Sequence, residues 1–130
     1  METQNPPSAF VIDDEFFNRD IFRIALESAG YVVAEAETGE GGLAVLAART
    51  FDLLILDLHI PGMSGREILK RVRAMPQHDK MQVTVVTANI PMATDDIQES
   101  ADFVMYKPID VAAFSKFVNR LKQVFAGNKD

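Results

Sequence analysis

Five short, almost uninterrupted apolar runs occur along this chain of 130 residues. They are Ala9–Ile12, Tyr31–Ala34, Leu53–Leu56, Val83–Val86 and Phe103–Tyr106. Several are rich in Val, Ile or aromatic residues, and their apolar residues follow one another instead of alternating with polar ones. This pattern is typical of parallel strands that are buried on both faces. We therefore interpret the five runs as strands of a parallel sheet.

Segments with helical periodicity follow the runs. Their apolar positions, spaced for one helix face, are Phe17, Ile21, Ile24 and Ala25; Leu43, Leu46 and Ala47; Ile68, Val72 and Met75; and Phe114, Val118, Leu121 and Phe125. Gly30 stands where a C-cap glycine closes the first helix. The segment between Thr87 and Asp102 contains Pro91, which is not tolerated in a helix interior, so we expect a short helix there, from about Met92 to Ser100.

Strands that alternate with helices predict right-handed crossovers and a doubly wound sheet. The predicted fold class is α/β, with a five-stranded parallel sheet of order 2-1-3-4-5 in a (βα)5 arrangement and an atypical, short fourth helix. We expect one domain over residues 8–126. Residues 1–7 are expected to form an extended lead-in and residues 127–130 a frayed tail.

The charge and the amino-acid composition of the chain exclude several classes of protein. The chain has 13 basic and 19 acidic side chains, a net charge of −6 and no Cys. A negative chain lacks the basic surface of a nucleic-acid binder, and the missing Cys excludes disulfide scaffolds and thiolate metal sites. The first residues lack the pattern of a signal peptide, and no apolar run approaches the length of a membrane span. We expect a soluble, cytoplasmic protein that contacts neither nucleic acid nor membrane.

Polar residues of particular types follow the predicted strands. Asp13 and Asp14 follow the first run, Asp57 the third, Thr87 the fourth and Lys107 the fifth. In a parallel sheet these positions share the edge formed by the carboxyl ends of the strands. Open α/β sheets bind ligands at that edge, where the strand order reverses. With the order 2-1-3-4-5, the three aspartates face one another across this point.

Three neighbouring carboxylates repel one another unless positive charge lies beside them. Lys107 supplies one charge, and Mg²⁺ suits the rest because it binds one or two carboxylates while keeping water and phosphate ligands. The simpler alternative is that Asp13 and Asp14 cap the following helix. Capping does not explain Thr87 and Lys107.

Four motifs, each just past an apolar run, give the chain a recognisable pattern. They are Asp13-Asp14-Glu15, the segment FDLLILDLHIPGMSG from Phe51 to Gly65, Thr87-Ala88 and Lys107-Pro108. From about Ser8 to Phe125, the chain resembles the CheY-like receiver domain of two-component response regulators. The resemblance implies a flavodoxin-like fold and a phosphorelay function. It also implies a cis Lys107–Pro108 bond.

The resemblance implies that Asp57 accepts a phosphoryl group from a histidine kinase or a His phosphotransfer protein. Asp14 then binds Mg²⁺ directly, Asp13 binds it through water, and Asp57 and the backbone carbonyl of His59 complete the protein ligands. Lys107 pairs with a phosphate oxygen, and the Thr87 hydroxyl turns toward the phosphoryl group. Such a protein is no enzyme for other substrates: at most it catalyses its own phosphorylation and dephosphorylation.

The side chains of His59 and Asn89 occupy the positions that tune the lifetime of the acyl phosphate in this family. One departure is Val104, which stands where receivers usually carry the aromatic residue that reports the movement of the Thr. Another aromatic residue can substitute for it, or Thr87 and its loop alone carry the signal. The stretch from Thr87 to Lys107 is also about two residues short.

Several alternatives stay open. The altered fourth helix and Val104 favour a phosphorylation-independent interaction module as a second hypothesis. An Asp phosphatase is disfavoured because His59 replaces the second Asp that such enzymes carry two residues on. The basic residues Arg66, Lys70 and Arg73 form a solvated helix face or a docking site for an acidic partner. The chain is a stand-alone receiver or the receiver of a longer regulator, and its downstream partner and oligomeric state are open.

Overall fold

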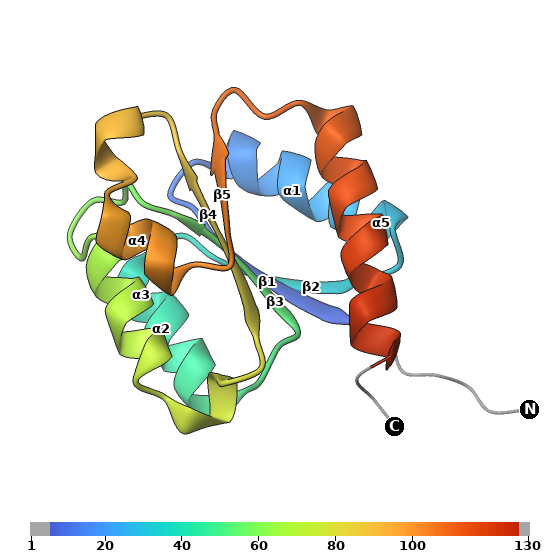
Figure 1. Ribbon diagram of the computed structural model, residues 1–130, viewed down its shortest axis with the longest axis horizontal. Helices are drawn as coiled ribbons and strands as arrows, with labels where there is room; N and C mark the ends of the chain where they lie inside the picture. The colour runs from blue at the N-terminus through green and yellow to red at the C-terminus, as the bar shows by residue number, and fades with distance from the viewer. Residues whose placement is uncertain (1–5, 128–130) are drawn as a thin grey trace, which may run out of the picture.

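The computed structural model describes residues 6–127. Its five strands form one parallel sheet in the order β2-β1-β3-β4-β5, as the sequence predicts (Figure 1). The strands are β1 (Ser8–Ile12), β2 (Val32–Ala36), β3 (Leu53–Asp57), β4 (Gln82–Thr87) and β5 (Phe103–Tyr106). The expected boundaries agree to within one or two residues. Predictions for residues 1–5 and 128–130 lie outside the described part.

Five α-helices cover the two faces of the sheet. They are α1 (Phe16–Ser28), α2 (Gly39–Ala48), α3 (Gly65–Arg73), α4 (Asp95–Ser100) and α5 (Val111–Gly127), and two 3-10 turns, η1 (Pro76–His78) and η2 (Ile90–Met92), precede β4 and α4. Figure 1 shows α2, α3 and α4 on one side of the sheet and α1 and α5 on the other. Within residues 6–127, no helix has the length and apolar character that crossing a membrane requires.

The uninterrupted apolar runs of the central strands are explained by these two helical layers. Phe10 and Ile12 of β1 pack toward α2 and α3, whereas Ala9 and Val11 pack toward α1 and α5. Side chains alternate along a strand, so a strand between two layers needs apolar residues at every position. The edge strands β2 and β5 are only partly buried. The prediction of burial on both faces therefore holds for the central strands alone.

The face that α1 buries overlaps the predicted stripe only in part. Phe22, Ala25 and Leu26 are buried, whereas Phe17 is 76% exposed and Ile24 is 51% exposed. The predicted stripe is therefore right for the buried Ala25, partly right for the half-buried Ile21 and wrong for Phe17 and Ile24. The reason is that α1 carries apolar residues on two overlapping faces, and spacing alone does not say which face meets the sheet. Gly30 does close the helix: its φ is +98°, and its N–H bonds to the carbonyl of Glu27.

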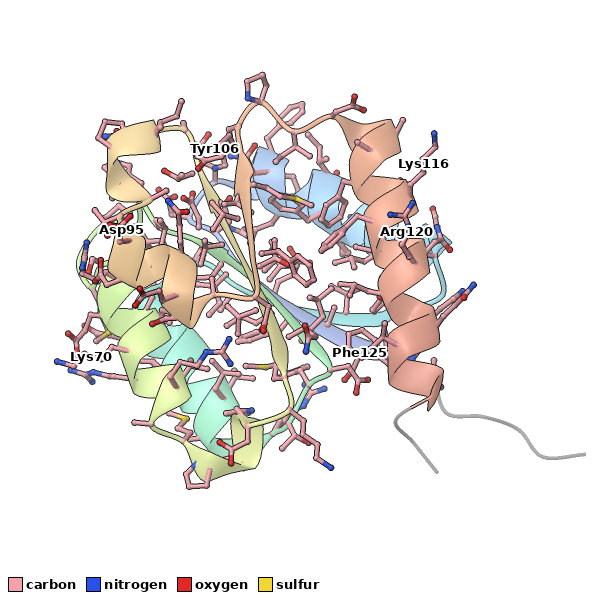
Figure 2. The ribbon with its side chains drawn as sticks, viewed as in Figure 1. Lys70, Asp95, Tyr106, Lys116, Arg120 and Phe125 are labelled. Atoms are coloured by element: carbon pink, nitrogen blue, oxygen red, sulfur yellow. The ribbon has the colours of Figure 1, made fainter. Side chains whose placement is uncertain are left out.

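The stripe predicted for α5 is confirmed, since Phe114, Val118, Leu121 and Phe125 are all buried. Figure 2 labels Phe125 near the end of this helix, and Lys116 and Arg120 along it. The ring of Phe125 meets the ring of Tyr31 edge-on at 6.3 Å, and the Tyr31 hydroxyl donates to the carbonyl of Val118 at 2.6 Å. These contacts fix α5 against the start of β2.

The fourth helix is short, as predicted, but begins later than Met92. Pro91 lies in the 3-10 turn η2, and Ala93 has a non-helical backbone with ψ of 65°. The chain resumes a helical path only after Thr94, so α4 has six residues. The expected single helix over 92–100 is therefore wrong at its start: the chain makes two separate short turns there.

Candidate functional site

The three aspartates meet at the carboxyl ends of β1 and β3, on the upper edge of the sheet in Figure 1. Carboxylate oxygens of Asp13, Asp14 and Asp57 lie within 4.8 Å of one another. Asp13 is 1% exposed and Asp57 is 4% exposed, while Asp14 is more open to solvent. The predicted cluster therefore forms, as two buried carboxylates with a third at their rim.

Lys107 reaches this cluster from the loop after β5. Its ammonium nitrogen Nζ lies 2.9 Å from Oδ2 of Asp57 and 3.2 Å from Oδ2 of Asp13. Burial alone favours a lower pKa for Lys107, but the hydrogen bond and charge of Asp57, together with Asp13, outweigh burial and raise the pKa. The Lys107–Pro108 peptide bond is cis, as the resemblance implies.

Burial raises the pKa of Asp13 above its ordinary value. The hydrogen bond from the Glu15 backbone lowers it, the charge of Asp57 raises it, and Lys107 opposes the rise. The net direction means that ionised Asp13 is held at an electrostatic cost. A site of this kind attracts further positive charge.

The backbone around Asp13 is fixed by two hydrogen bonds. The Glu15 N–H donates to Oδ1 of Asp13 at 2.9 Å, and Nη1 of Arg19 donates to the Asp13 carbonyl at 2.8 Å. Arg19 is 11% exposed at its side chain and also pairs with Glu35 at the end of β2. The N-cap of α1 is Glu15, without a side-chain cap, so the capping alternative for Asp13 and Asp14 is wrong.

The chain after Asp57 folds back tightly. The His59 N–H donates to Oδ1 of Asp57 at 2.9 Å, and the Gly65 N–H donates to the carbonyl of Leu58 at 3.1 Å. A Cβ at Gly65 would lie 2.4 Å from Cα of Leu58, so only glycine fits. Ser64 caps α3 by accepting from the Glu67 N–H. These contacts position Asp57 from both sides of its loop.

Thr87 ends β4 and is fully buried. Its hydroxyl accepts from the N–H of Asn89 at 3.0 Å and donates to the carbonyl of Asn89 at 3.2 Å. On the neighbouring strand, Tyr106 is in register with Thr87 and is 43% exposed. Val104, two residues earlier, packs into the core on the α3 and α4 side. In Figure 2, Tyr106 marks the end of β5 at this edge.

The structure brings most of the expected residues together. Asp13, Asp14, Asp57 and Lys107 converge directly, and Thr87 ends the strand beside β3. The side chains of His59 and Asn89 are exposed at the rim. Two contributors were missed: Arg19, which no motif marks, and the tight approach at Gly65. The capping pattern of Ser64 and Glu67 just before an apolar stripe is a sequence signal for the second.

Comparison with known proteins agrees with this geometry. Residues 9–119 match the family model of the response regulator receiver domain. The chain belongs to the receiver family. The receiver structure from Methylobacillus flagellatus superposes with a TM-score of 0.82 at 24% identity, covering 90% of this chain and 99% of that one. The fold is thus the CheY-like fold, as the sequence predicts.

Receiver relatives with higher identity include two longer regulators. The transcriptional regulatory protein AfsQ1 of Streptomyces coelicolor is 32% identical over 109 residues, covering 79% of this chain and 45% of that protein. The DNA-binding transcriptional regulator NtrC of Salmonella typhimurium is 32% identical over 113 residues, covering 85% of this chain and 24% of that protein. The chain spans less than half the length of these relatives.

Among solved receivers, the response regulator protein TrrA of Thermotoga maritima was determined in complex with Mg²⁺ and beryllium fluoride. It is 28% identical to this chain with a TM-score of 0.78, covering 88% of this chain and 98% of that one.

Proposed function

We propose that this receiver takes part in a two-component phosphorelay by accepting a phosphoryl group on Asp57. The observation that carries the proposal is the contact between the buried carboxylate of Asp57 and Nζ of Lys107, beside Asp13 and Asp14. A phosphoacceptor site requires a carboxylate that can form an acyl phosphate and a positive charge close to it.

The donor set suits Mg²⁺. Three carboxylates within reach of one another, with the pKa of Asp13 raised by burial and by Asp57, supply hard oxygen ligands and an excess of negative charge. Asp14 and Asp57 would hold the ion directly, Asp13 through water, and the His59 carbonyl would complete the protein's share. When bound, Mg²⁺ supplies charge neutralisation for the phosphoryl oxygens.

In the transfer step, the protein mainly holds the reacting groups in position. An oxygen of Asp57 forms a bond to phosphorus while the bond from phosphorus to the donor's imidazole nitrogen breaks, and the imidazole leaves with its electron pair. Lys107 already donates a hydrogen bond to Oδ2 of Asp57, so it lies where it can pair with an oxygen of the transferred phosphoryl group. The tight loop through Gly65 keeps Asp57 at the strand end during the transfer.

Thr87 carries the response in this proposal. Its hydroxyl is bonded to the Asn89 backbone, and it leaves those bonds to reach the phosphoryl oxygens after modification. Two arrangements of the loop after β4 then differ in population, depending on the state of Asp57. The exposed side chains of His59 and Asn89 flank the route of water and set the lifetime of the acyl phosphate.

The proposed partners are a histidine kinase or a His phosphotransfer protein as donor, and a downstream protein as receiver of the signal. The protein turns over no external substrate; it promotes only its own phosphorylation and dephosphorylation. A cytoplasmic location, where such donors present their phosphohistidine, is part of the proposal.

Binding of beryllofluoride, which mimics the acyl phosphate, tests the proposal. In the presence of Mg²⁺, we expect it to shift the backbone NMR resonances of Asp57, Thr87 and Lys107 in the wild type. Asp57→Asn should show no shift, while the control Asp79→Asn, an exposed residue before β4, should behave as wild type. Shifts in Asp57→Asn equal to those of the wild type would contradict the assignment of Asp57.

A further inference from the structure

Two of the basic residues on α3 bind the neighbouring helix α4. The sequence predicted either a solvated helix face or a docking site for an acidic partner. Lys70 is exposed, on the side of α3 seen in Figure 2. Arg66 and Arg73, seven residues apart on the same helix face, instead reach the two ends of α4 and its flanks. The prediction of a purely solvated or partner-binding stripe is therefore wrong for these two arginines: α4 is their partner.

Arg73 holds the C-terminal end of α4. Its Nε donates to the Ser100 carbonyl at 2.7 Å, and its Nη2 donates to Oδ2 of Asp102 at 2.9 Å. The same Asp102 oxygen accepts from the Val83 N–H at 2.7 Å, so this end is tied to β4 as well. The side chains of Arg73 and Asp102 are 28% and 33% exposed. This attachment is partly buried and uses backbone as well as side chains.

Arg66 holds the other end with looser contacts. Its guanidinium bonds the carboxylate of Asp96 and donates from Nη2 to the Thr94 hydroxyl at 2.7 Å. Arg66 is 52% exposed and Asp96 is 60% exposed. These are contacts between exposed side chains, where an ion pair contributes little because water competes for both partners. The N-terminal attachment of α4 is therefore the weaker of the two.

α4 depends on such attachments. It has six residues, far below the roughly 12 to 15 at which an isolated helix becomes even marginally stable. Thr94 at its N-cap makes no side-chain cap bond to the helix backbone, and Ile97 is buried against the core. A pocket of about 300 Å³, open to solvent on one side, lies between the start of α3 and this end of α4, and its lining includes Leu58, Arg66, Met92 and Thr94. The N-terminal end of α4 is therefore not closely packed against the start of α3.

The weak end of α4 is also the end nearest Thr87. The Thr87 hydroxyl holds both backbone groups of Asn89, and Asn89 is the residue from which η2 begins. The Met92 N–H in turn bonds the Asn89 carbonyl at 3.0 Å. Movement of the Thr87 hydroxyl thus frees the turn that leads directly into Thr94 and Asp96.

We propose that Arg66 is a releasable latch and Arg73 a hinge for α4: the N-terminal end of α4 swings away from α3 when the Thr87 hydroxyl leaves Asn89, while the C-terminal end stays attached. Arg66 is thus a positioning residue for the response. It couples the movement of Thr87 to α4, a role that Val104 cannot fill because it lacks the aromatic ring usual at its position. The trigger rests on the proposed phosphorylation of Asp57, whereas the unequal attachment of the two ends does not.

Amide hydrogen exchange at the two ends of α4, followed by NMR without any phosphodonor, tests the attachment. The Gln98 N–H bonds the Thr94 carbonyl near the latch, and the Ala101 N–H bonds the Ile97 carbonyl near the hinge. In Arg66→Ala we expect Gln98 to exchange roughly three- to tenfold faster while Ala101 changes little. The matched control is Arg71→Ala, which removes an equally exposed arginine that pairs with Glu67 of its own helix.

Two results would overturn the latch. One is an effect of Arg66→Ala on Gln98 no larger than that of Arg71→Ala. The other is equal acceleration of Gln98 and Ala101, since α4 would then open as one unit without a hinge. Asp96→Asn, which removes the partner of Arg66, should reproduce the pattern of Arg66→Ala, and wild-type exchange in that variant also counts against the latch.

Beryllofluoride with Mg²⁺ separates the latch from its trigger. In the wild type it should speed the exchange of Gln98, and Arg66→Ala should bind it roughly two- to fivefold more tightly because release no longer opposes binding. Failure of the wild type to bind beryllofluoride at all would contradict the proposed function and leave the exchange result standing. Binding with unchanged Gln98 exchange and equal affinities would contradict the coupling to Thr87.

Discussion

At the scale of single residues, the site holds more negative charge than its own positive charge neutralises. Asp13 and Asp57 are both buried, and both bond the single ammonium group of Lys107. Burying two carboxylates beside one ammonium costs free energy, which other interactions of the fold must offset. The same imbalance gives the site its affinity for a cation.

Asp13→Asn should therefore stabilise the metal-free protein. The amide keeps an oxygen that can accept from the Glu15 N–H, while the buried charge and its repulsion with Asp57 disappear. We expect the free energy of unfolding, measured with urea in EDTA near neutral pH, to rise by about 1 kcal/mol. A variant less stable than the wild type would show that the Lys107–Asp13 pair outweighs the repulsion.

The pH dependence of this gain has a defined sign. Because the folded-state pKa of Asp13 is raised, the folded protein binds more protons than the unfolded chain above the ordinary pKa of Asp. Stability is then lost as pH rises through the raised pKa. We expect the advantage of Asp13→Asn over the wild type to grow between about pH 4 and pH 7 and to be small at the acid end. An advantage that shrinks toward neutral pH would contradict the raised pKa.

Lys107→Ala separates modification from response. Asp57 keeps its position through the His59 N–H, so acetyl phosphate should still add a phosphoryl group to it. Without the ammonium group nothing pairs with the phosphoryl oxygen from this side, and we expect the NMR shifts of Asn89 and Met92 seen in the phosphorylated wild type to be lost. Lys70→Ala, on the exposed side of α3, is the control. Identical shifts in Lys107→Ala and the wild type would count against its role.

At the scale of elements, α1 shows what periodicity leaves undecided. The predicted stripe of Phe17, Ile21, Ile24 and Ala25 overlaps a second set of apolar residues, Phe22, Ala25 and Leu26. Each set fits a helix face, and packing against β1, β2 and α5 selects the second. A pattern read within one helix does not contain that choice.

Substitutions at two phenylalanines of α1 test which face of the helix packs against the sheet. Phe22 is 2% exposed and meets Phe114 edge-on at 5.1 Å, whereas Phe17 is 76% exposed. We expect Phe22→Ala to lower the free energy of unfolding by about 3 to 5 kcal/mol and Phe17→Ala to change it by less than about 0.5 kcal/mol. Denaturant unfolding of both variants is sufficient. Equal losses would mean that α1 presents a different face to the sheet.

The turn into α3 is a second element whose geometry matters for the site. In Gly65→Ala the new Cβ would lie 2.7 Å from the Asp57 carbonyl, so the backbone of the acceptor loop must shift. We expect a loss of about 2 kcal/mol in unfolding free energy together with weaker binding of beryllofluoride. Gly41→Ala in α2 is the control for a crowded Cβ away from the site, because that Cβ would meet only the Thr38 hydroxyl, at 2.9 Å, and no part of the acceptor loop. Unchanged beryllofluoride affinity in Gly65→Ala would show that the loop adapts without moving Asp57.

At the scale of the whole molecule, the strand order and the meeting point of the acidic residues follow from the sequence. Continuous apolar runs that alternate with helical segments indicate a parallel sheet between two helical layers, and the residues that follow the strands then share one edge. Asp13, Asp57 and Lys107 were predictable for this reason.

What the sequence did not predict depends on contacts between distant segments. Arg66 and Arg73 contact opposite ends of α4, so their roles depend on where α4 lies. Pro91 alone does not predict the position of that helix. Arg19 bonds a backbone carbonyl, an acceptor that every residue offers, so no residue pattern marks it. Such contacts become visible only once the sheet has brought α1, α3 and α4 into position.

The identity of the acceptor is the central claim, and intact mass measures it most directly. The wild type, Asp57→Asn and the exposed control Asp79→Asn are each incubated with Mg²⁺ and acetyl phosphate and weighed by mass spectrometry. We expect the wild type and Asp79→Asn to gain the mass of one phosphoryl group and Asp57→Asn to gain none. A phosphoryl group on Asp57→Asn at the wild-type rate would contradict the claim that Asp57 is the acceptor.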